Sequence, residues 1–176
     1  RLDDMALGIE CLLSDDPADA LAKAQRLDAL NRERRGIEAG MQQQALAALA
    51  ALKLSEADTS LPRGLCLFDE SWHQGVIGIL AARIKDRLHR PVIAFAPANG
   101  DEIKGSARSV AGLHIRDALE ACATRHPELL QKFGGHAMAA GLSLRRVDFA
   151  AFSAAFDAEV CRHLDESDLH GRLWTD

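Results

Sequence analysis

Short apolar runs and segments with helical spacing alternate along the chain from residue 64 to residue 164. Four runs bounded by glycine, proline or charged residues predict strands: GLCLFD (64–69), PVIAFAP (91–97), EIKGSARSV (102–110) and AAGLSLRR (139–146). Apolar residues three or four positions apart predict helices over residues 73–89, 114–126 and 147–164. Strands that alternate with helices indicate an α/β fold, here a small mixed sheet flanked by helices.

The residues before this region predict helices only. Residues 2–13 predict a short helix, and Pro17 fits the first turn of a second helix, with Asp15 or Asp16 as its cap. An apolar stripe that no proline interrupts extends this second helix to about residue 54. Because the stripe is narrow, we expect a long helix that connects two domains rather than a coiled-coil arm.

Composition excludes several classes of protein. With 176 residues, 48% of them hydrophobic and 27% charged, the chain is long and apolar enough for a folded core. A net charge of −5 excludes a broad basic surface, so any nucleic-acid binding must rest on a local patch. No apolar stretch approaches the ~18 residues of a membrane span, and no signal peptide is visible. We therefore expect no membrane partner.

The four cysteines, Cys11, Cys66, Cys122 and Cys161, are far apart, and no Cys-x-x-Cys or Cys/His pattern occurs. A structural zinc site is therefore not expected. Apolar neighbours around three of them predict buried side chains, which fits a cytoplasmic protein. The chain begins with Arg1 inside a helical pattern, so we expect it to be a fragment of a longer protein.

The strand predicted at residues 102–110 has two different faces. Lys104, Ser106 and Arg108 alternate with apolar or small residues, so a strand places all three on one face. A lysine, a hydroxyl and a guanidinium in a row suit a phosphate or carboxylate ligand. The alternative is an ordinary solvated strand face.

The stretch SWHQGVIG follows one predicted strand and opens the next helix. Ligands of α/β sheets bind at the carboxyl ends of strands, where helix N-termini offer N–H groups to anions. We expect Trp72 and His73 to stack on a base or sugar and to bond a phosphate, and Gly75 to leave room. Ser71 or Asp69 would cap the helix. The alternative is a tryptophan packed over the sheet edge beside a capping histidine.

The stretch FGGHAMAAG places two glycines directly before a histidine. Gly134 and Gly135 permit a positive φ or a close approach of the backbone, and His136 stands where a loop is expected to enter a strand. An ordinary turn is the alternative. Three stretches of this kind at strand–helix boundaries favour one common binding site.

The stretches SWHQGVIGILAARI, KGSARS and FGGHAMAAG, in this order and spacing, resemble the DHH-associated domain of RecJ-type single-strand-specific exonucleases. RLDDMALGIECLLSDD and LNRERR are similar to the segment that joins the catalytic DHH domain of that family to this one. The resemblance implies four parts: residues 1–16 (the end of the catalytic domain or a linker), 17–54 (the connecting helix), 62–164 (a substrate-binding domain) and 165–176 (a tail).

The resemblance also implies a ligand and a reaction. The ligand would be a single DNA strand, with its phosphates on Ser106, Arg108, His136 and the neighbouring glycines, and with Trp72 and His73 at the border of the site. The intact enzyme would hydrolyse phosphodiester bonds from a DNA end in repair and recombination, with two manganese or magnesium ions in the DHH domain. This chain has no Asp-His-His and no Asp-x-Asp pattern. We therefore expect no catalytic residue, metal ligand or cofactor in it, and the missing DHH domain and a single-strand-binding protein as partners.

Two other functions remain open. One is a nucleic-acid-binding module such as the related domain of alanyl-tRNA synthetases, which contacts RNA without catalysis. The other is a part of an oligoribonuclease or small phosphoesterase of the DHH superfamily. The sequence that precedes Arg1 in the intact protein is the discriminating observation: a DHH motif with a long spacer supports the exonuclease, and a synthetase body supports the nucleic-acid-binding module.

Overall fold

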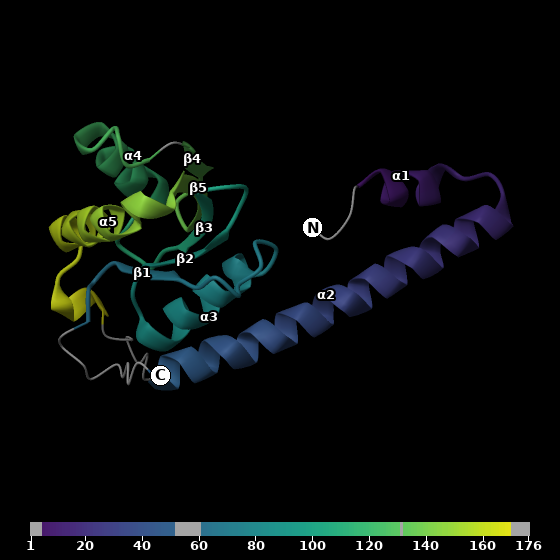
Figure 1. Cartoon of the computed structure of the whole chain (residues 1–176), viewed down its shortest axis with the longest axis horizontal. Coiled ribbons are helices and arrows are strands. Elements are labelled where there is room, and N and C mark those ends of the chain that lie inside the picture. The colour runs from purple at the N-terminus through teal and green to yellow at the C-terminus, as the bar shows by residue number, and fades with distance from the viewer. Residues whose placement is uncertain (1–4, 52–60, 131, 170–176) are drawn as a thin grey trace, which may run out of the picture. The chain divides into compact units, whose positions relative to one another are not determined.

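The chain folds into two units, Arg1–Leu46 and Ala47–Asp176. The computed structural model describes residues 5–51, 61–130 and 132–169 (Figure 1). The first unit consists of α1 (Ala6–Leu13) and the greater part of α2 (Pro17–Ala51). Both helices occur where the sequence predicts them, and residues 52–54 of the expected second helix lie outside the described residues.

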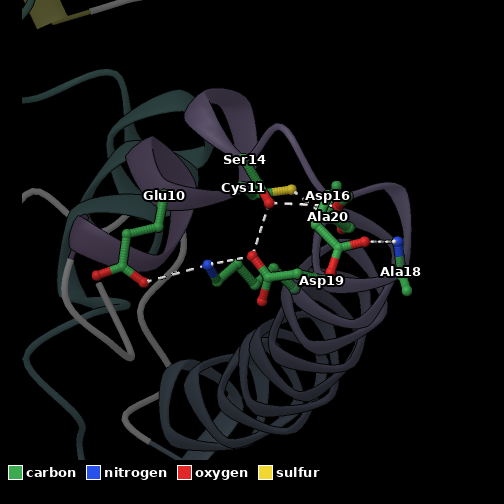
Figure 2. Close-up of polar contacts among 8 residues, drawn as sticks. Glu10, Cys11, Ser14, Asp16, Ala18, Asp19 and Ala20 are labelled. Atoms are coloured by element: carbon green, nitrogen blue, oxygen red, sulfur yellow. Dashed lines mark hydrogen bonds and ion pairs between the residues drawn. The ribbon is translucent and has the colours of Figure 1, made fainter.

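A set of polar contacts fixes the turn between α1 and α2 (Figure 2). The carboxylate of Asp16 accepts a hydrogen bond from the backbone N–H of Ala18 at 2.9 Å, which confirms Asp16 as the cap of α2. The carboxylate of Asp19 accepts from the Ser14 hydroxyl at 2.6 Å and pairs with Lys23 at 2.7 Å. The hydrogen bond from Lys23 and then that from Ser14 are the main causes that lower the pKa of the Asp19 carboxyl. Lys23 also lies 3.7 Å from Glu10, so one lysine links the two helices.

The second unit contains a five-stranded sheet in the order β1-β2-β3-β5-β4. The strands are β1 (Leu65–Phe68), β2 (Val92–Pro97), β3 (Glu102–Arg108), β4 (Lys132–Gly135) and β5 (Ala139–Arg145). Only β1 and β2 are parallel to each other, and the other neighbours are antiparallel. The mixed α/β fold is therefore confirmed. The four predicted strands are present, as β1, β2, β3 and β5. The sequence did not predict β4, because two adjacent glycines weaken the pattern of a strand.

Three helices flank the sheet: α3 (Ile77–Leu88), α4 (Ile115–Arg125) and α5 (Phe149–His163). Helices α4 and α5 lie on one face, and α3 lies on the other over β2 and β3 (Figure 1). Two short 3₁₀ helices, η1 (Arg146–Asp148) and η2 (Glu166–Leu169), complete the unit. The helix expected over residues 147–164 thus begins at Phe149, since Val147 belongs to η1 and is exposed.

The main core lies between the sheet and the helices α4 and α5. Phe152 and Phe156 of α5 are fully buried and stack with their ring centroids 6.2 Å apart. Phe95 of β2 meets Phe152 edge to face at 5.9 Å. Burying aromatic side chains in this way stabilises a fold by roughly 1.5–3 kcal/mol each. One face of the sheet is therefore committed to the core, so a ligand that binds the sheet itself would lie on the other face.

Cys122 of α4 is buried, Cys11 and Cys66 are half-buried, and Cys161 is exposed. Burial raises the pKa of the Cys122 thiol to about 11 and raises that of Cys66 as well. The expectation of three buried cysteines is thus fully met only by Cys122. Cys66 lies in β1, an edge strand, which leaves one side of its backbone uncovered.

Candidate nucleic-acid interface

The face of the sheet that α4 and α5 leave uncovered carries polar residues in rows across three strands. Ile103 and Ala107 of β3 are buried in the main core, so Lys104, Ser106 and Arg108 point to the opposite face, as the sequence predicts. Antiparallel partners share a face, and the register extends each row into β5 and β4. From one end to the other the rows are Arg108–Ala139, Ser106–Gly141–Gly134, Lys104–Ser143–Lys132 and Glu102–Arg145.

Arg108 and Ser106 form the centre of this face. A guanidinium nitrogen of Arg108 donates to the Ser106 hydroxyl oxygen at 3.1 Å and to the backbone carbonyl of Ala107 at 2.8 Å. Both side chains are half-buried, and burial lowers the pKa of Arg108, although a guanidinium stays protonated at neutral pH. A partly desolvated guanidinium held in one orientation is well placed to bind an oxyanion.

Helix α3 comes close to this pair because it has a glycine there. A Cβ atom at Gly78 would lie 2.8 Å from a guanidinium nitrogen of Arg108 and 3.1 Å from the Ser106 hydroxyl. Any other residue would push against the end of the arginine side chain. Gly78 therefore leaves the space in which the guanidinium lies.

His136 is held beside the same rows by a tight hairpin between β4 and β5. Its backbone N–H donates to the Ala139 carbonyl at 2.8 Å, which places it level with the Arg108–Ala139 row. The next two carbonyls, of Ala137 and Met138, accept from Ile115 at 2.9 Å and Ser109 at 3.0 Å. The hairpin is thus bonded to the segment that follows Arg108, and the His136 side chain is exposed.

The two glycines before His136 have different roles. Gly135 has φ +155°, and a Cβ there would lie 2.4 Å from the Ala139 carbonyl oxygen, so the hairpin requires glycine. Gly134 lies on the polar face, where a Cβ would meet no atom within 4 Å. Both belong to β4 rather than to a loop, which corrects the sequence-based expectation. Gly135 is structural, and Gly134 leaves the polar face bare.

The turn that contains Trp72, His73 and Gly75 precedes α3 and is not its first turn. The helix begins at Ile77, and no side chain caps it. The Asp69 carboxylate accepts instead from the N–H and hydroxyl of Ser71, at 2.8 and 2.6 Å. The expected start at residue 73 and the expected cap were therefore wrong, because Asp69 stabilises a separate turn.

Trp72 and His73 differ in exposure. Trp72 is only 7% exposed, so its indole ring is not presented for stacking on a base, contrary to expectation. His73 is exposed, and its Nδ1 accepts from the backbone N–H of Gly75 at 3.0 Å. The neutral ring then carries its proton on Nε2, which makes Nε2 a donor for an anion.

A further bond ties this turn to the sheet. The side-chain nitrogen of Gln74 donates to the Pro97 carbonyl at 2.8 Å, at the end of β2. Pro97 pairs with Ile103, the neighbour of Lys104. The structure therefore brings the His73 turn to the Lys104 end of the polar face, and it gathers Lys104, Ser106 and Arg108 with Gly134 and His136 on or beside that face.

The sequence did not point to two residues of this face, Lys132 and Ser143. Lys132 is two residues before Gly134, and Ser143 is two residues after Gly141. The alternation of a strand would have indicated Lys132 and Ser143 if residues 132–135 had been taken for a strand. The approach of Gly78 to Arg108 has no counterpart in the sequence pattern, because it depends on how α3 packs on β3.

The polar face is positively charged although the chain is acidic. It carries Lys104, Arg108, Lys132 and Arg145 against Glu102, whereas the whole chain has a net charge of −5. Arg145 is paired with Asp148 at 2.6 and 3.0 Å. A local cluster of cations on an acidic protein is one of the features expected of an anion or nucleic-acid site.

Two kinds of feature are absent from the described residues. Among the described residues, no group of three or more histidine, cysteine, aspartate and glutamate side chains is arranged to hold a metal ion. In the same part of the chain, no helix combines the length and the apolar character that crossing a bilayer demands.

Comparison with known proteins identifies the family. The DHHA1 domain matches residues 61–161, more than half of the chain. The chain belongs to the DHHA1 domain family. Over all 176 residues it is 57% identical to the single-stranded-DNA-specific exonuclease RecJ of Dickeya dadantii and 52% identical to that of Escherichia coli. It covers 30% of each of these relatives, so the chain spans about a third of their length.

Solved structures support the same relationship. The crystal structure of RecJ in complex with Mg²⁺ from Thermus thermophilus has a TM-score of 0.71 and 32% identity, over 91% of this chain and 23% of that one. A structure of exonuclease RecJ bound to manganese has a TM-score of 0.72 and 31% identity, over 92% of this chain and 37% of that one. The resemblance of the DHHA1 domain to RecJ, stated first from its motifs, is confirmed.

Proposed function

We propose that this chain is the strand-binding part of a single-stranded-DNA-specific exonuclease that acts in DNA repair and recombination. The observation that carries the proposal is the Ser106–Arg108 pair, half-buried under Gly78 on the positive face of a DHHA1 domain. The identity of 52–57% over the whole chain to proteins named for that activity supports it.

In this function Arg108 and Ser106 bind a phosphate near the end of the strand. The guanidinium supplies two N–H donors in a fixed plane and the hydroxyl a third donor, which together match the oxygens of one phosphate. His136 and the Nε2–H of His73 lie at the two ends of the face and donate to neighbouring phosphates. Trp72 borders the site without stacking, since it is buried.

In this proposal, hydrolysis is carried out by another domain of the polypeptide. The relatives of known structure hold Mg²⁺ or manganese, and the described residues of this chain offer no group that fits such an ion. We therefore assign the metal ions to a DHH domain in the same polypeptide and derive no bond-breaking step from this chain. The chain by itself binds the strand and does not cleave it.

The intact protein is proposed to act in the cytoplasm, where four free cysteines are chemically stable, and to meet DNA coated by a single-strand-binding protein. The two alternatives are a nucleic-acid-binding module like that of alanyl-tRNA synthetases and a small phosphoesterase of the DHH superfamily. Neither is favoured by a specific feature of the polar face.

Binding measurements test the proposal. Fluorescence anisotropy of the intact protein without divalent metal is expected to give tighter binding to single-stranded than to double-stranded DNA, and Arg108→Ala is expected to weaken it. Arg116, exposed on α4, provides the control, and Arg116→Ala is expected to bind normally. Equal affinity of wild type and Arg108→Ala for single strands would exclude Arg108 from the interface.

A further inference from the structure

The row next to Ser106 contains three polar residues side by side: Lys104 on β3, Ser143 on β5 and Lys132 on β4. Neighbouring strands are ~4.8 Å apart, so the Cα atoms of the two lysines are about 10 Å apart with Ser143 between them. Both lysines are exposed, and neither forms an ion pair with the described part of the chain. Two unpaired ammonium groups at this distance can both reach one anion.

Ser143 is the unusual member of this row. It is only 8% exposed, and its hydroxyl has no hydrogen-bond partner within the described residues. No fully enclosed side-chain nitrogen or oxygen among those residues lacks a partner, so the Ser143 hydroxyl keeps contact with solvent. A hydroxyl that reaches solvent and has no protein partner in the described part of the chain is free to bond a ligand or water.

Bare backbone links this row to the Ser106–Arg108 pair. Gly141 and Gly134 continue the Ser106 row into β5 and β4, where a Cβ on Gly134 would meet nothing within 4 Å and one on Gly141 only a carbonyl oxygen at 4.0 Å. Alternate residues of a β-strand are ~6.8 Å apart. This distance is comparable to that between successive phosphates of an extended single strand of DNA. A DNA backbone can therefore cross the glycines from one row to the next.

The unpaired positive charge of the polar face does not extend beyond this row. In the Glu102–Arg145 row, the arginine is already paired with Asp148, and Glu102 repels phosphate. The positive strip thus extends from Arg108 and His136 to Lys104 and Lys132, and no further.

We propose that Lys104, Ser143 and Lys132 form a second phosphate subsite, one phosphate along the strand from the group held by Ser106 and Arg108. The inference rests on the proposed function and deepens it by naming the residues that would hold the second phosphate of the strand. Each lysine contributes one charge-assisted contact, and the serine hydroxyl donates between them.

The test compares two probes with the intact protein in EDTA, which prevents hydrolysis. One probe is a 5′-phosphorylated oligo(dT) of about 12 nucleotides, and the other is thymidine 5′-monophosphate as a competitor. Lys104→Met and Lys132→Met keep the alkyl stems and remove the charge, and Arg116→Met on α4 is the matched control. Each lysine variant is expected to bind the oligonucleotide several-fold more weakly and to lower the slope of log affinity against log salt by about 0.7. Monophosphate binding is expected to stay within twofold.

The outcomes separate this inference from the proposed function. Lysine variants that behave like Arg116→Met, or that weaken both probes equally, overturn the second subsite. If Arg108→Ala still weakens both probes in that case, the proposed function stands. If Arg108→Ala weakens neither probe, the proposed function fails and the second subsite fails with it.

Discussion

Gly78 of α3 lies so close to Arg108 of β3 that a Cβ atom on it would be 2.8 Å from a guanidinium nitrogen. The atom it would meet is the far end of a flexible side chain, so the fold can tolerate the extra methyl group while the arginine cannot keep its position. This relationship separates the requirements of binding from those of stability, because a substitution at Gly78 disturbs the site and leaves the core intact.

Gly78→Ala is therefore expected to weaken single-strand binding several-fold without lowering the melting temperature. Alanine is favoured over glycine in a helix by up to about 1 kcal/mol, which offsets the displacement of Arg108. Gly36→Ala on α2 is the matched control, since a Cβ there meets nothing within 4 Å. Anisotropy and thermal melting of both variants check the prediction. Unchanged binding in Gly78→Ala would mean that the observed position of the guanidinium is not the one that DNA requires.

Arg108→Ala is expected to slow turnover of the intact enzyme by about 10- to 150-fold. A charge-assisted hydrogen bond to phosphate contributes roughly 1.5–3 kcal/mol, which corresponds to that range of rates. Arg108→Lys should restore only part of the rate, because an ammonium cannot supply two parallel donors. If His136 binds the same phosphate, His136→Ala combined with Arg108→Ala should cost less than the sum of the single losses.

Steady-state kinetics on a short single strand, with melting temperature as the control, decide the role of Arg108. Wild-type rates in Arg108→Ala would remove it from the site. A large drop in melting temperature would show instead that the arginine is structural.

The sequence predicted the face of β3 correctly because one strand with alternating character defines its own two faces. Lys104, Ser106 and Arg108 are placed by that period alone. β4 escaped prediction since Gly134 and Gly135 suit a turn as well as a strand, and without β4 the row that contains Lys132 and Ser143 is not visible. The burial of Trp72 and the approach of Gly78 to Arg108 depend on contacts between segments distant in sequence, which no local pattern encodes.

A second group of charges, far from the polar face, is expected to act on stability only. The Glu159 carboxylate on α5 is almost fully buried and contacts Arg125 of α4, with His163 at 3.1 Å and Arg162 at 3.8 Å. Arg125→Met should reduce the free energy of unfolding by about 1–3 kcal/mol, less than the 3–5 kcal/mol lost when a fully buried pair is broken, because Arg162 and the hydrogen bond with His163 remain. The double variant Arg125→Met, Glu159→Met should recover most of the loss.

Urea unfolding of the three proteins checks this expectation, with DNA affinity unchanged in all of them. A double variant less stable than Arg125→Met would show that Glu159 is stabilised mainly by Arg162 and His163.

The adjacent glycines of β4 provide the sharpest test, because the structure assigns them opposite roles. At Gly135, φ is +155° and a Cβ would lie 2.4 Å from a backbone oxygen that cannot move aside. Gly135→Ala should therefore destabilise the protein by about 1–3 kcal/mol or more. At Gly134 a side chain would enter open space. Gly134→Val should leave stability unchanged or raise it by up to about 1 kcal/mol, since valine favours strands.

The two substitutions should affect DNA affinity in the opposite order to stability. The valine of Gly134→Val would stand on the bare backbone of the Ser106 row, beside the row that contains Lys132, so single-strand affinity should fall at least several-fold in a protein that melts at or above the wild-type temperature. Gly135→Ala, measured at a temperature where it remains folded, should lose less affinity than Gly134→Val. Melting curves and anisotropy on the two variants give all four values. Full affinity in a stable Gly134→Val protein would show that the DNA backbone does not cross this part of the sheet.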